Sequence, residues 1–198
     1  MPQILLNKEA IILASGSPRR VDFFKDLGLL FRVEIANIEE KRNNNEAPEE
    51  YTRRLALEKA AAVAKQYPEQ WVVAADTVVC CDESILEKPT DAEDALQMLL
   101  LLRNREHIVR SSVCLMHSGR SVTDLCSVAT SVTFWDFSEE IALRYVQTKE
   151  SLDKAGAYGI QGRGAFLVRR ISGSYSNVVG LPLVECIEML ARHGVVRV

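Results

Sequence analysis

Residues 11–20 read Ile-Ile-Leu-Ala-Ser-Gly-Ser-Pro-Arg-Arg, an apolar run that passes directly into small, polar and then basic residues. Proline suits the first position of a helix and Ser17 before it suits the N-cap, so we expect a strand to end and a helix to begin here. A helix start presents unpaired N–H groups and a partial positive charge. With two hydroxyls, Arg19 and Arg20 beside it, this turn favours an anion, most naturally a phosphate chain, although an ordinary strand–turn–helix corner with surface arginines is the alternative.

Hydrophobic periodicity and turn residues predict the remaining elements. The expected helices are 18–27, 48–67, 90–102 (opening on a capping box at Thr90), 138–146 and 181–192. The expected strands are 31–36, 71–81, 107–117, 121–137 and 165–171, with loops at 41–47 and 172–180. Helices and strands alternate early, whereas the consecutive strands around Gly119 indicate antiparallel pairing. The sequence therefore predicts an α/β fold with a mixed sheet.

Composition narrows the class of protein. The chain has 198 residues, 47% of them hydrophobic and 26% charged, which suits one large domain or two closely packed lobes. A net charge of -3 provides no basic field for nucleic acid. No apolar run reaches the roughly 18–20 residues of a membrane span, and the N-terminal residues do not form a secretory signal. Five cysteines without paired or metal-ligand spacing indicate free thiols, so we expect a soluble, cytoplasmic protein.

Asp76 is the residue that least resembles plain structure. It interrupts the apolar run 72–79, where a desolvated charge is costly unless it is paired, bound to a metal or exposed at a cleft. A carboxylate at a strand end bonded to nearby backbone is the structural alternative. We interpret Asp76 as a residue that binds a metal or orients a water molecule.

Other charged residues carry weaker signals. Glu39 and Glu40 follow a strand and could supply a second carboxylate, although such pairs are more often simply solvated. Lys59 lies on the apolar stripe of its helix, where snorkelling is the simpler explanation, but it could also reach a phosphate. Lys88 is uninformative alone. The small and polar residues of 153–162 are typical of a close-fitting loop at a site.

The motifs LASGSPRR, IEEKR, AADTVV, LEKP and DKAGAYGIQGRGA, in this order and at these intervals, resemble the Maf family of nucleotide pyrophosphatases. The resemblance covers about residues 13–190. It implies that residues 1–198 form a single Maf-like domain, with two lobes around a central cleft, similar to the inosine triphosphate pyrophosphatases. It also implies a homodimer and hydrolysis of a nucleoside triphosphate to the monophosphate and pyrophosphate, dependent on a divalent metal cation (Mg²⁺ or Mn²⁺).

The resemblance assigns roles to individual residues. Asp76 corresponds to the catalytic acid or base, and Glu39 to its partner for metal or water. The phosphate-binding positions are Ser15, Ser17, Arg20, Lys59 and Lys88. The positions that differ between branches are Arg19, Thr77 and Gln161, a combination similar to the dTTP/UTP branch. A 7-methyl-GTP-type enzyme and a non-catalytic, nucleotide-binding regulator of septum formation are the alternatives.

The chain departs from the family pattern between residues 103 and 112. A glycine is expected near Asn104 and a threonine near Ser111. These differences affect a surface turn and the expected dimer contact, and they leave the chemistry unchanged. No membrane or nucleic-acid partner is expected.

Overall fold

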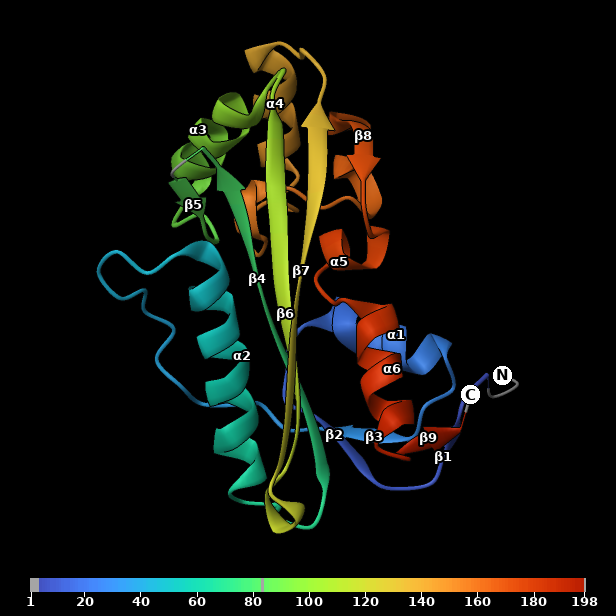
Figure 1. Cartoon of the computed structure of the whole chain (residues 1–198). Helices are drawn as coiled ribbons and strands as arrows, with labels where there is room; N and C mark the ends of the chain where they lie inside the picture. Colours follow the sequence, from blue (N-terminus) through green and yellow to red (C-terminus); the bar gives the residue numbers. More distant parts are fainter. Residues whose placement is uncertain (1–3, 83, 198) are drawn as a thin grey trace. The chain divides into compact units, whose positions relative to one another are not determined.

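The computed structural model describes residues 4–82 and 84–197, in which helices and strands alternate from the N-terminus onward (Figure 1). The helices are α1 (Pro18–Asp26), α2 (Pro48–Ala64), α3 (Ala92–Leu102), α4 (Glu139–Gln147), α5 (Tyr175–Val179) and α6 (Leu183–Arg192). The strands are β1 (Leu6–Asn7), β2 (Ile11–Leu13), β3 (Phe31–Val33), β4 (Trp71–Cys81), β5 (Ser84–Leu86), β6 (Glu106–His117), β7 (Val122–Phe134), β8 (Val168–Ser172) and β9 (Val196–Arg197). Short 3-10 helices are η1 (Ser118–Arg120), η2 (Ala155–Ala157) and η3 (Gly162–Leu167).

Seven of the described strands form one mixed sheet. Hydrogen-bonded neighbours follow the order β3-β2-β4-β6-β7-β8, and β5 pairs with β4. Strand β2 is parallel to both β3 and β4, so that Ile11 lies opposite Phe31 on one side and Trp71 on the other. The pairs β4/β5 and β7/β8 are antiparallel. The predicted α/β fold with a mixed sheet is confirmed.

The chain divides into two compact units. Unit 1 comprises residues 1–76, 111–127 and 180–198, and unit 2 comprises residues 77–110 and 128–179. Strands β4, β6 and β7 therefore contribute residues to both units. The division in β4 falls directly after Asp76.

Unit 1 is a sheet with helices on both faces, as its period-two sequence pattern requires. Alternate residues of β2 and β4, such as Leu13 and Val73, belong to a core shared with Phe24 of α1 and Leu190 of α6. The intervening residues belong to a second core with α2, which contains Ile12, Val72, Ala74, Ala56 and Ala60. Figure 1 shows α2 on one face and α1 and α6 on the other. A strand buried on both faces reads as a nearly continuous apolar run, which is why 71–81 stands out in the sequence.

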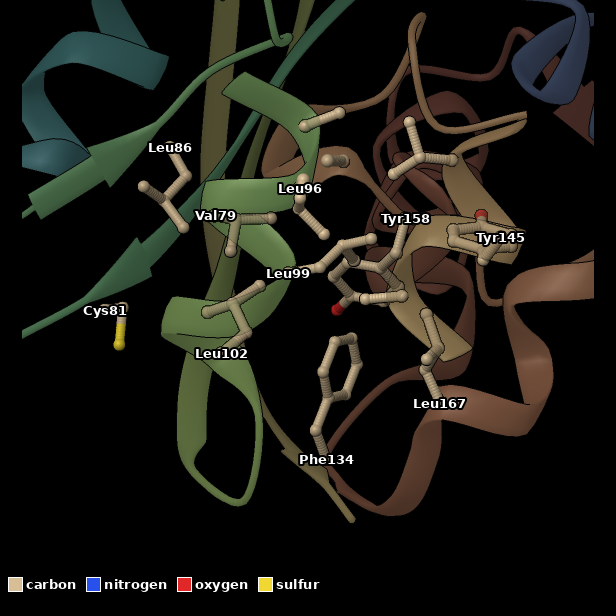
Figure 2. Packing of buried hydrophobic residues seen from close by; sticks show 14 of the residues in the cluster. Val79, Cys81, Leu86, Leu96, Leu99, Leu102, Phe134, Tyr145, Tyr158 and Leu167 are labelled. Atoms are coloured by element: carbon tan, nitrogen blue, oxygen red, sulfur yellow. The ribbon is translucent and has the colours of Figure 1, made fainter. Parts of the chain in front are cut away.

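Unit 2 has one core beneath α3 and α4. Leucines of α3, including Leu99, pack with Val79 of β4, Phe134 of β7 and Tyr158 of the loop after η2 (Figure 2). The ring of Tyr158 lies edge-on to Phe134, with their centroids 4.7 Å apart. This aromatic contact ties the loop that contains Gln161 to the sheet of the same unit.

The structure corrects three of the predicted elements. The strand expected at 165–171 begins only at Val168, because residues 162–167 form η3. The loop expected at 172–180 contains the short helix α5. The N-cap of α3 is Asp91, which accepts a hydrogen bond from the Asp94 N–H, rather than Thr90.

The backbone explains the departure at Asn104. This residue has a φ of 55°, in the left-handed region where glycine is favoured and asparagine is one of the few other residues tolerated. Asn104 therefore preserves the turn between α3 and β6 without glycine. Ser111 is fully buried in β6. No helix among the described residues is both long and apolar enough to cross a membrane.

Candidate active site

Asp76 lies near the middle of β4, at the boundary of unit 1. Within the alternation of this strand, Val72 and Ala74 face α2, and Asp76 continues the same face. Its exposure is 6%, so the carboxylate has little access to water. Burial of this kind demands a partner for the charge.

That partner is Lys59, which projects from α2. The Lys59 Nζ lies 2.8 Å from Asp76 Oδ1 and 2.8 Å from Glu40 Oε2. Lys59 is buried, so its ammonium ends between two carboxylates instead of extending into water. Snorkelling, the simpler interpretation of its position on the apolar stripe, is therefore wrong. The structure adds Glu40 to the group, a residue that the sequence indicated only as half of an acidic pair.

The environment of Asp76 makes its carboxylate a stronger base than usual. Burial raises the pKa of Asp76 above its ordinary value, and the negative charge of Glu40 adds to this rise. Lys59, through its charge and its hydrogen bond, and Arg20, through its charge, oppose the rise. The carboxylate is thus desolvated but has two cations nearby.

The turn before α1 brings the Ser15 hydroxyl and the Arg20 guanidinium close to the residue that precedes Asp76. Ser17 is the N-cap of α1, as predicted, but its side chain makes no capping hydrogen bond. Its N–H donates to Ser15 Oγ at 3.2 Å. Arg20 Nη1 donates to Ser15 Oγ and to the Ala75 carbonyl, and Arg20 Nε donates to the Gly180 carbonyl. Arg20 therefore braces the residue before Asp76 as well as supplying positive charge.

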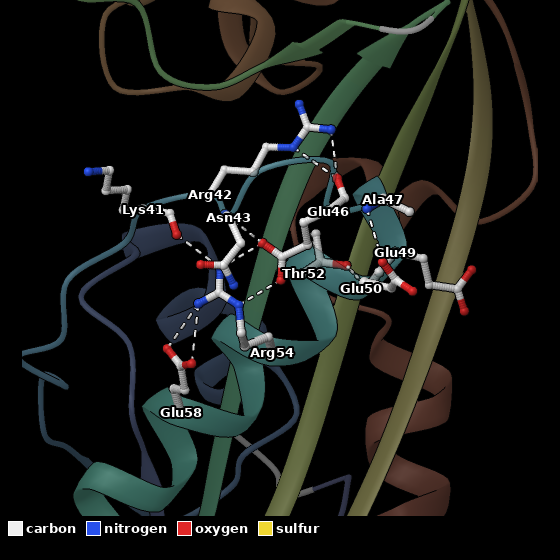
Figure 3. Close-up of polar contacts among 10 residues, drawn as sticks. All are labelled: Lys41, Arg42, Asn43, Glu46, Ala47, Glu49, Glu50, Thr52, Arg54 and Glu58. Atoms are coloured by element: carbon white, nitrogen blue, oxygen red, sulfur yellow. Dashed lines mark hydrogen bonds and ion pairs between the residues drawn. The ribbon is translucent and has the colours of Figure 1, made fainter.

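The segment after Glu40 is held by an ion pair between Arg54 and the buried carboxylate of Glu46 (Figure 3). Arg54 of α2 binds both carboxylate oxygens of Glu46, at 2.6 and 2.8 Å, and also donates to the Lys41 carbonyl. Arg42 donates to the Glu46 carbonyl. The hydrogen bonds from Arg54 lower the pKa of Glu46 to about 2. This network anchors the loop next to Glu40 on the first turns of α2.

Glu39 has different surroundings from Glu40. It lines a polar hollow of about 440 Å³ together with Lys41, Arg42, Asn43, Asn44 and Arg54. Among the described residues, Glu40 rather than Glu39 is the carboxylate that contacts Lys59. The metal-binding role assigned to Glu39 stays a prediction.

The carboxylate oxygens of Asp76 and Glu40 are suitable ligands for a divalent cation that also binds phosphate oxygens of a substrate. Asp76 Oδ1 accepts a hydrogen bond from Lys59 Nζ at 2.8 Å. No three His, Cys, Asp or Glu side chains within residues 4–82 and 84–197 gather to enclose a metal ion. Mg²⁺ characteristically uses one or two carboxylates and completes its shell with water and phosphate oxygens. Asp76 and Glu40 offer carboxylate oxygens of the kind that such a cation uses.

Three predicted site residues belong to unit 2. Thr77 follows Asp76 in β4 and is partly buried, and Lys88 is exposed just after β5. Gln161 is exposed and precedes η3. The carbonyl of Glu87 accepts the N–H of Gly156 at 3.1 Å, which joins the Lys88 segment to the loop that contains Gln161.

The remaining predicted specificity residue, Arg19, lies in the first turn of α1 in unit 1 and is partly buried. The structure thus brings Ser15, Ser17, Arg20, Lys59 and Asp76 together within unit 1. It places Thr77, Lys88 and Gln161 in unit 2.

Comparison with known proteins identifies the family. The sequence profile of the Maf-like protein family matches residues 10–193. The chain belongs to this family. A dTTP/UTP pyrophosphatase of Desulfotalea psychrophila is 49% identical to this Maf-like protein over 188 residues, which cover 95% of this chain and 96% of the relative. A dTTP/UTP pyrophosphatase of Nitratidesulfovibrio vulgaris is 50% identical over 187 residues, which cover 94% and 89%. Membership confirms the resemblance that the five motifs indicate.

A more distant likeness is to a crystal structure of a nucleoside-triphosphatase, a dITP/XTP pyrophosphatase, from Mycobacterium abscessus. It is 14% identical, covers 93% of this chain and 96% of that one, and has a TM-score of 0.46. This likeness is too remote to bear on the residues of the site.

Proposed function

We propose that this Maf-like protein is a nucleoside triphosphate pyrophosphatase that hydrolyses dTTP and UTP, and modified pyrimidine triphosphates, to the monophosphate and pyrophosphate. The observation that carries the proposal is the buried Asp76 carboxylate, paired with Lys59 and close to the start of α1. The names of the relatives support the pyrimidine substrates.

In the proposed reaction, water attacks the α-phosphorus. A bond forms between the water oxygen and phosphorus, the bond to the bridging oxygen breaks, and pyrophosphate leaves. Asp76 accepts the proton of the attacking water, a role that its raised pKa favours because a stronger base is a better general base. Ser15, Ser17, Arg20, Lys59 and Lys88 bind the phosphates, whose negative charge must be offset for attack to occur.

We further propose that a divalent cation, Mg²⁺ or Mn²⁺, takes part. Asp76 and the acidic pair 39–40 are the residues that would hold it. When bound, the cation supplies positive charge that offsets the charge of the triphosphate. Lys59 contacts both Asp76 and Glu40, so its ammonium lies among the carboxylates that would hold the cation.

Base choice is assigned to Arg19, Thr77 and Gln161. The Gln161 amide offers a donor and an acceptor, and the edge of uracil or thymine presents an N–H and carbonyl oxygens. A glutamate at this position would only accept hydrogen bonds, and it would repel those carbonyls. The side chain of Gln161 is exposed, as recognition of a ligand requires.

The function is tested with a panel of canonical and modified triphosphates, scored for pyrophosphate release with and without Mg²⁺ or Mn²⁺. We expect dTTP and UTP to be hydrolysed at the highest kcat/KM and the activity to disappear on chelation. Release of pyrophosphate from 7-methyl-GTP in preference to UTP would contradict the pyrimidine assignment. Binding of nucleotides without turnover would favour the regulatory alternative.

The base assignment is tested by Gln161→Glu. We expect this variant to lower kcat/KM for dTTP and UTP by about 10-fold, because one mispaired polar contact costs about 1–3 kcal/mol. Hydrolysis of 7-methyl-GTP should fall less or rise. If the ratio of the two kcat/KM values does not change, Gln161 does not recognise the base.

A further inference from the structure

Glu150 lies just after α4 in unit 2, and the proposed function gives it no role. Its carboxylate accepts two backbone hydrogen bonds, from the Arg163 N–H to Oε2 and from the Gly164 N–H to Oε1, both at 3.0 Å. The Tyr145 hydroxyl donates to Oε1 at 3.1 Å. An acid at the end of a helix is ordinarily solvated, so these three donors are an unusual set of partners for one.

Tyr145 also holds the backbone on the N-terminal side of Gln161. Its hydroxyl accepts the Gly159 N–H at 3.2 Å. Backbone groups two residues before and two residues after Gln161 are therefore bonded to one Tyr145–Glu150 pair. The Gln161 side chain is exposed, and these hydrogen bonds hold the backbone on its two sides.

The glycines of this loop show how closely it packs on the pair. A Cβ on Gly164 would lie 2.5 Å from both the Tyr145 hydroxyl oxygen and the Gly159 carbonyl oxygen. Gly162 has a φ of 76°, and a Cβ there would lie 3.0 Å from Glu150 Oε2. Side chains at these positions would force the loop away from Glu150. The glycines therefore permit the contact, and Glu150 supplies it.

We propose that Glu150 is a positioning residue that, with Tyr145, holds the backbone on both sides of Gln161 and thereby sets the preference for a pyrimidine base. The proposal rests on the base-reading role of Gln161 in the proposed function. Glu150 acts through Gln161 and does not itself touch the substrate.

The charge of Glu150 matters to this role. Burial acts to raise the pKa of Glu150, but the N–H groups of Gly164 and Arg163 and the Tyr145 hydroxyl outweigh it, so the pKa lies below its ordinary value. The carboxylate is therefore ionised at neutral pH and accepts from all three donors. In Glu150→Gln one accepting oxygen becomes an NH₂ group, which faces an N–H donor and leaves it unsatisfied.

The test is a double-mutant cycle of Glu150→Gln and Gln161→Ala, in which kcat and KM are measured for UTP and GTP. Glu140→Gln is the matched control, because Glu140 lies in α4, is exposed and pairs only with Arg144 among the described residues. We expect Glu150→Gln to lower the UTP-to-GTP ratio of kcat/KM by about 10-fold, mainly through the KM for UTP, and Glu140→Gln to leave it unchanged. In the double variant the ratio should fall no further than in Gln161→Ala, because coupled residues are not additive.

Two results would overturn the proposal and leave the proposed function intact. In one, Glu150→Gln leaves the ratio unchanged while Gln161→Ala lowers it. In the other, the two losses multiply in the double variant. A ratio unchanged by Gln161→Ala would instead remove the base-reading role of Gln161, and the positioning role with it.

Tyr145→Phe provides an independent variant if Glu150→Gln does not fold. It retains the ring, which packs against Phe166 with centroids 6.1 Å apart, and removes only the hydroxyl. We expect the ratio to change in the same direction by a smaller factor. An unchanged ratio in a folded Tyr145→Phe protein would overturn the shared role of the pair.

Discussion

Asp76 in unit 1 is a buried carboxylate and Glu150 in unit 2 a partly buried one, and their pKa values move in opposite directions. Burial dominates at Asp76 and raises its pKa, against the opposing charges of Lys59 and Arg20. At Glu150 the backbone N–H donors outweigh burial, and the pKa falls. The partners of both carboxylates lower the pKa, so the depth of burial decides the direction: Asp76 is buried and Glu150 only partly so.

The two kinds of partner also differ in what they allow. A lysine side chain can move toward a ligand and release the carboxylate, because it has rotatable bonds and one of its contacts is the half-exposed Glu40. Backbone N–H groups cannot move without moving the loop. Of these two carboxylates, the one that faces a side-chain cation has the proposed chemical role, and the one that faces backbone donors has the proposed positioning role.

The largest expected effect comes from Asp76→Asn. Asparagine preserves the size of the side chain and removes the group that accepts the proton, so we expect kcat to fall by at least about 100-fold while the fold is retained. The measurement is steady-state hydrolysis of UTP together with circular dichroism. Asp136→Asn is the control, since Asp136 is 70% exposed and its one ion pair among the described residues is a long one with Arg103, at 3.7 Å. Full activity in a folded Asp76→Asn protein would remove Asp76 from the chemistry.

A smaller effect is expected when the cation beside Asp76 is removed. Lys59 lowers the pKa of Asp76, so Lys59→Met should raise that pKa further. The ionised carboxylate is the active form. A higher pKa therefore moves the acid limb of the kcat/KM profile to higher pH. At neutral pH we expect a loss of about 10-fold, the magnitude of a lost hydrogen bond to a charged group.

Lys65→Met is the control for this prediction. Lys65 is the exposed C-cap of the same helix. Its pH profile should match that of the unmodified protein. An acid limb that stays in place, or moves to lower pH, in Lys59→Met would show that Lys59 does not govern the titration of Asp76.

The smallest effect is expected at Glu46, a buried carboxylate that faces the side-chain cation of Arg54. Its pKa is about 2 in the folded protein, below the ordinary value of 4.5, so its contribution to stability is present above pH 4.5 and is lost as the pH falls toward 2. Glu46→Gln should lower the Tm by about 1–4 °C at pH 7 and by almost nothing near pH 2. Thermal unfolding at both pH values, with Glu140→Gln alongside, checks this. An equal loss at both pH values would show that packing, not charge, is what Glu46 contributes.

The predictability of the fold follows the strength of local patterns. Strand 71–81 was predicted at its observed bounds, because a strand buried on both faces produces an uninterrupted apolar run. Helix α1 was predicted to within one residue from proline at its first position and glycine after its end. The 3-10 helix η3 and the five-residue helix α5 were missed, because elements this short have too few residues to show a period.

The sequence likewise identified those site residues that have a strong local signal and missed those that do not. Asp76 was identified because a single charge in an apolar strand is conspicuous, and the motif residues were identified because the family pattern is specific. Glu150 was missed, since an acid after a helix looks the same in sequence whether it is solvated or bonded to a loop. The position of Lys59 on an apolar stripe did not distinguish a snorkelling side chain from one that ends on Asp76.

The sequence by itself determined the order of the long elements, the mixed α/β character, the family and the residue types available for chemistry. Only the tertiary structure decided the partners of those residues: Lys59 with Asp76, 17 positions away, and Glu150 with the N–H groups of residues 163 and 164. The physical reason is that periodicity and capping depend on neighbours along the chain. Desolvation, charge pairing and the direction of a pKa shift depend on groups that only folding brings within hydrogen-bond distance.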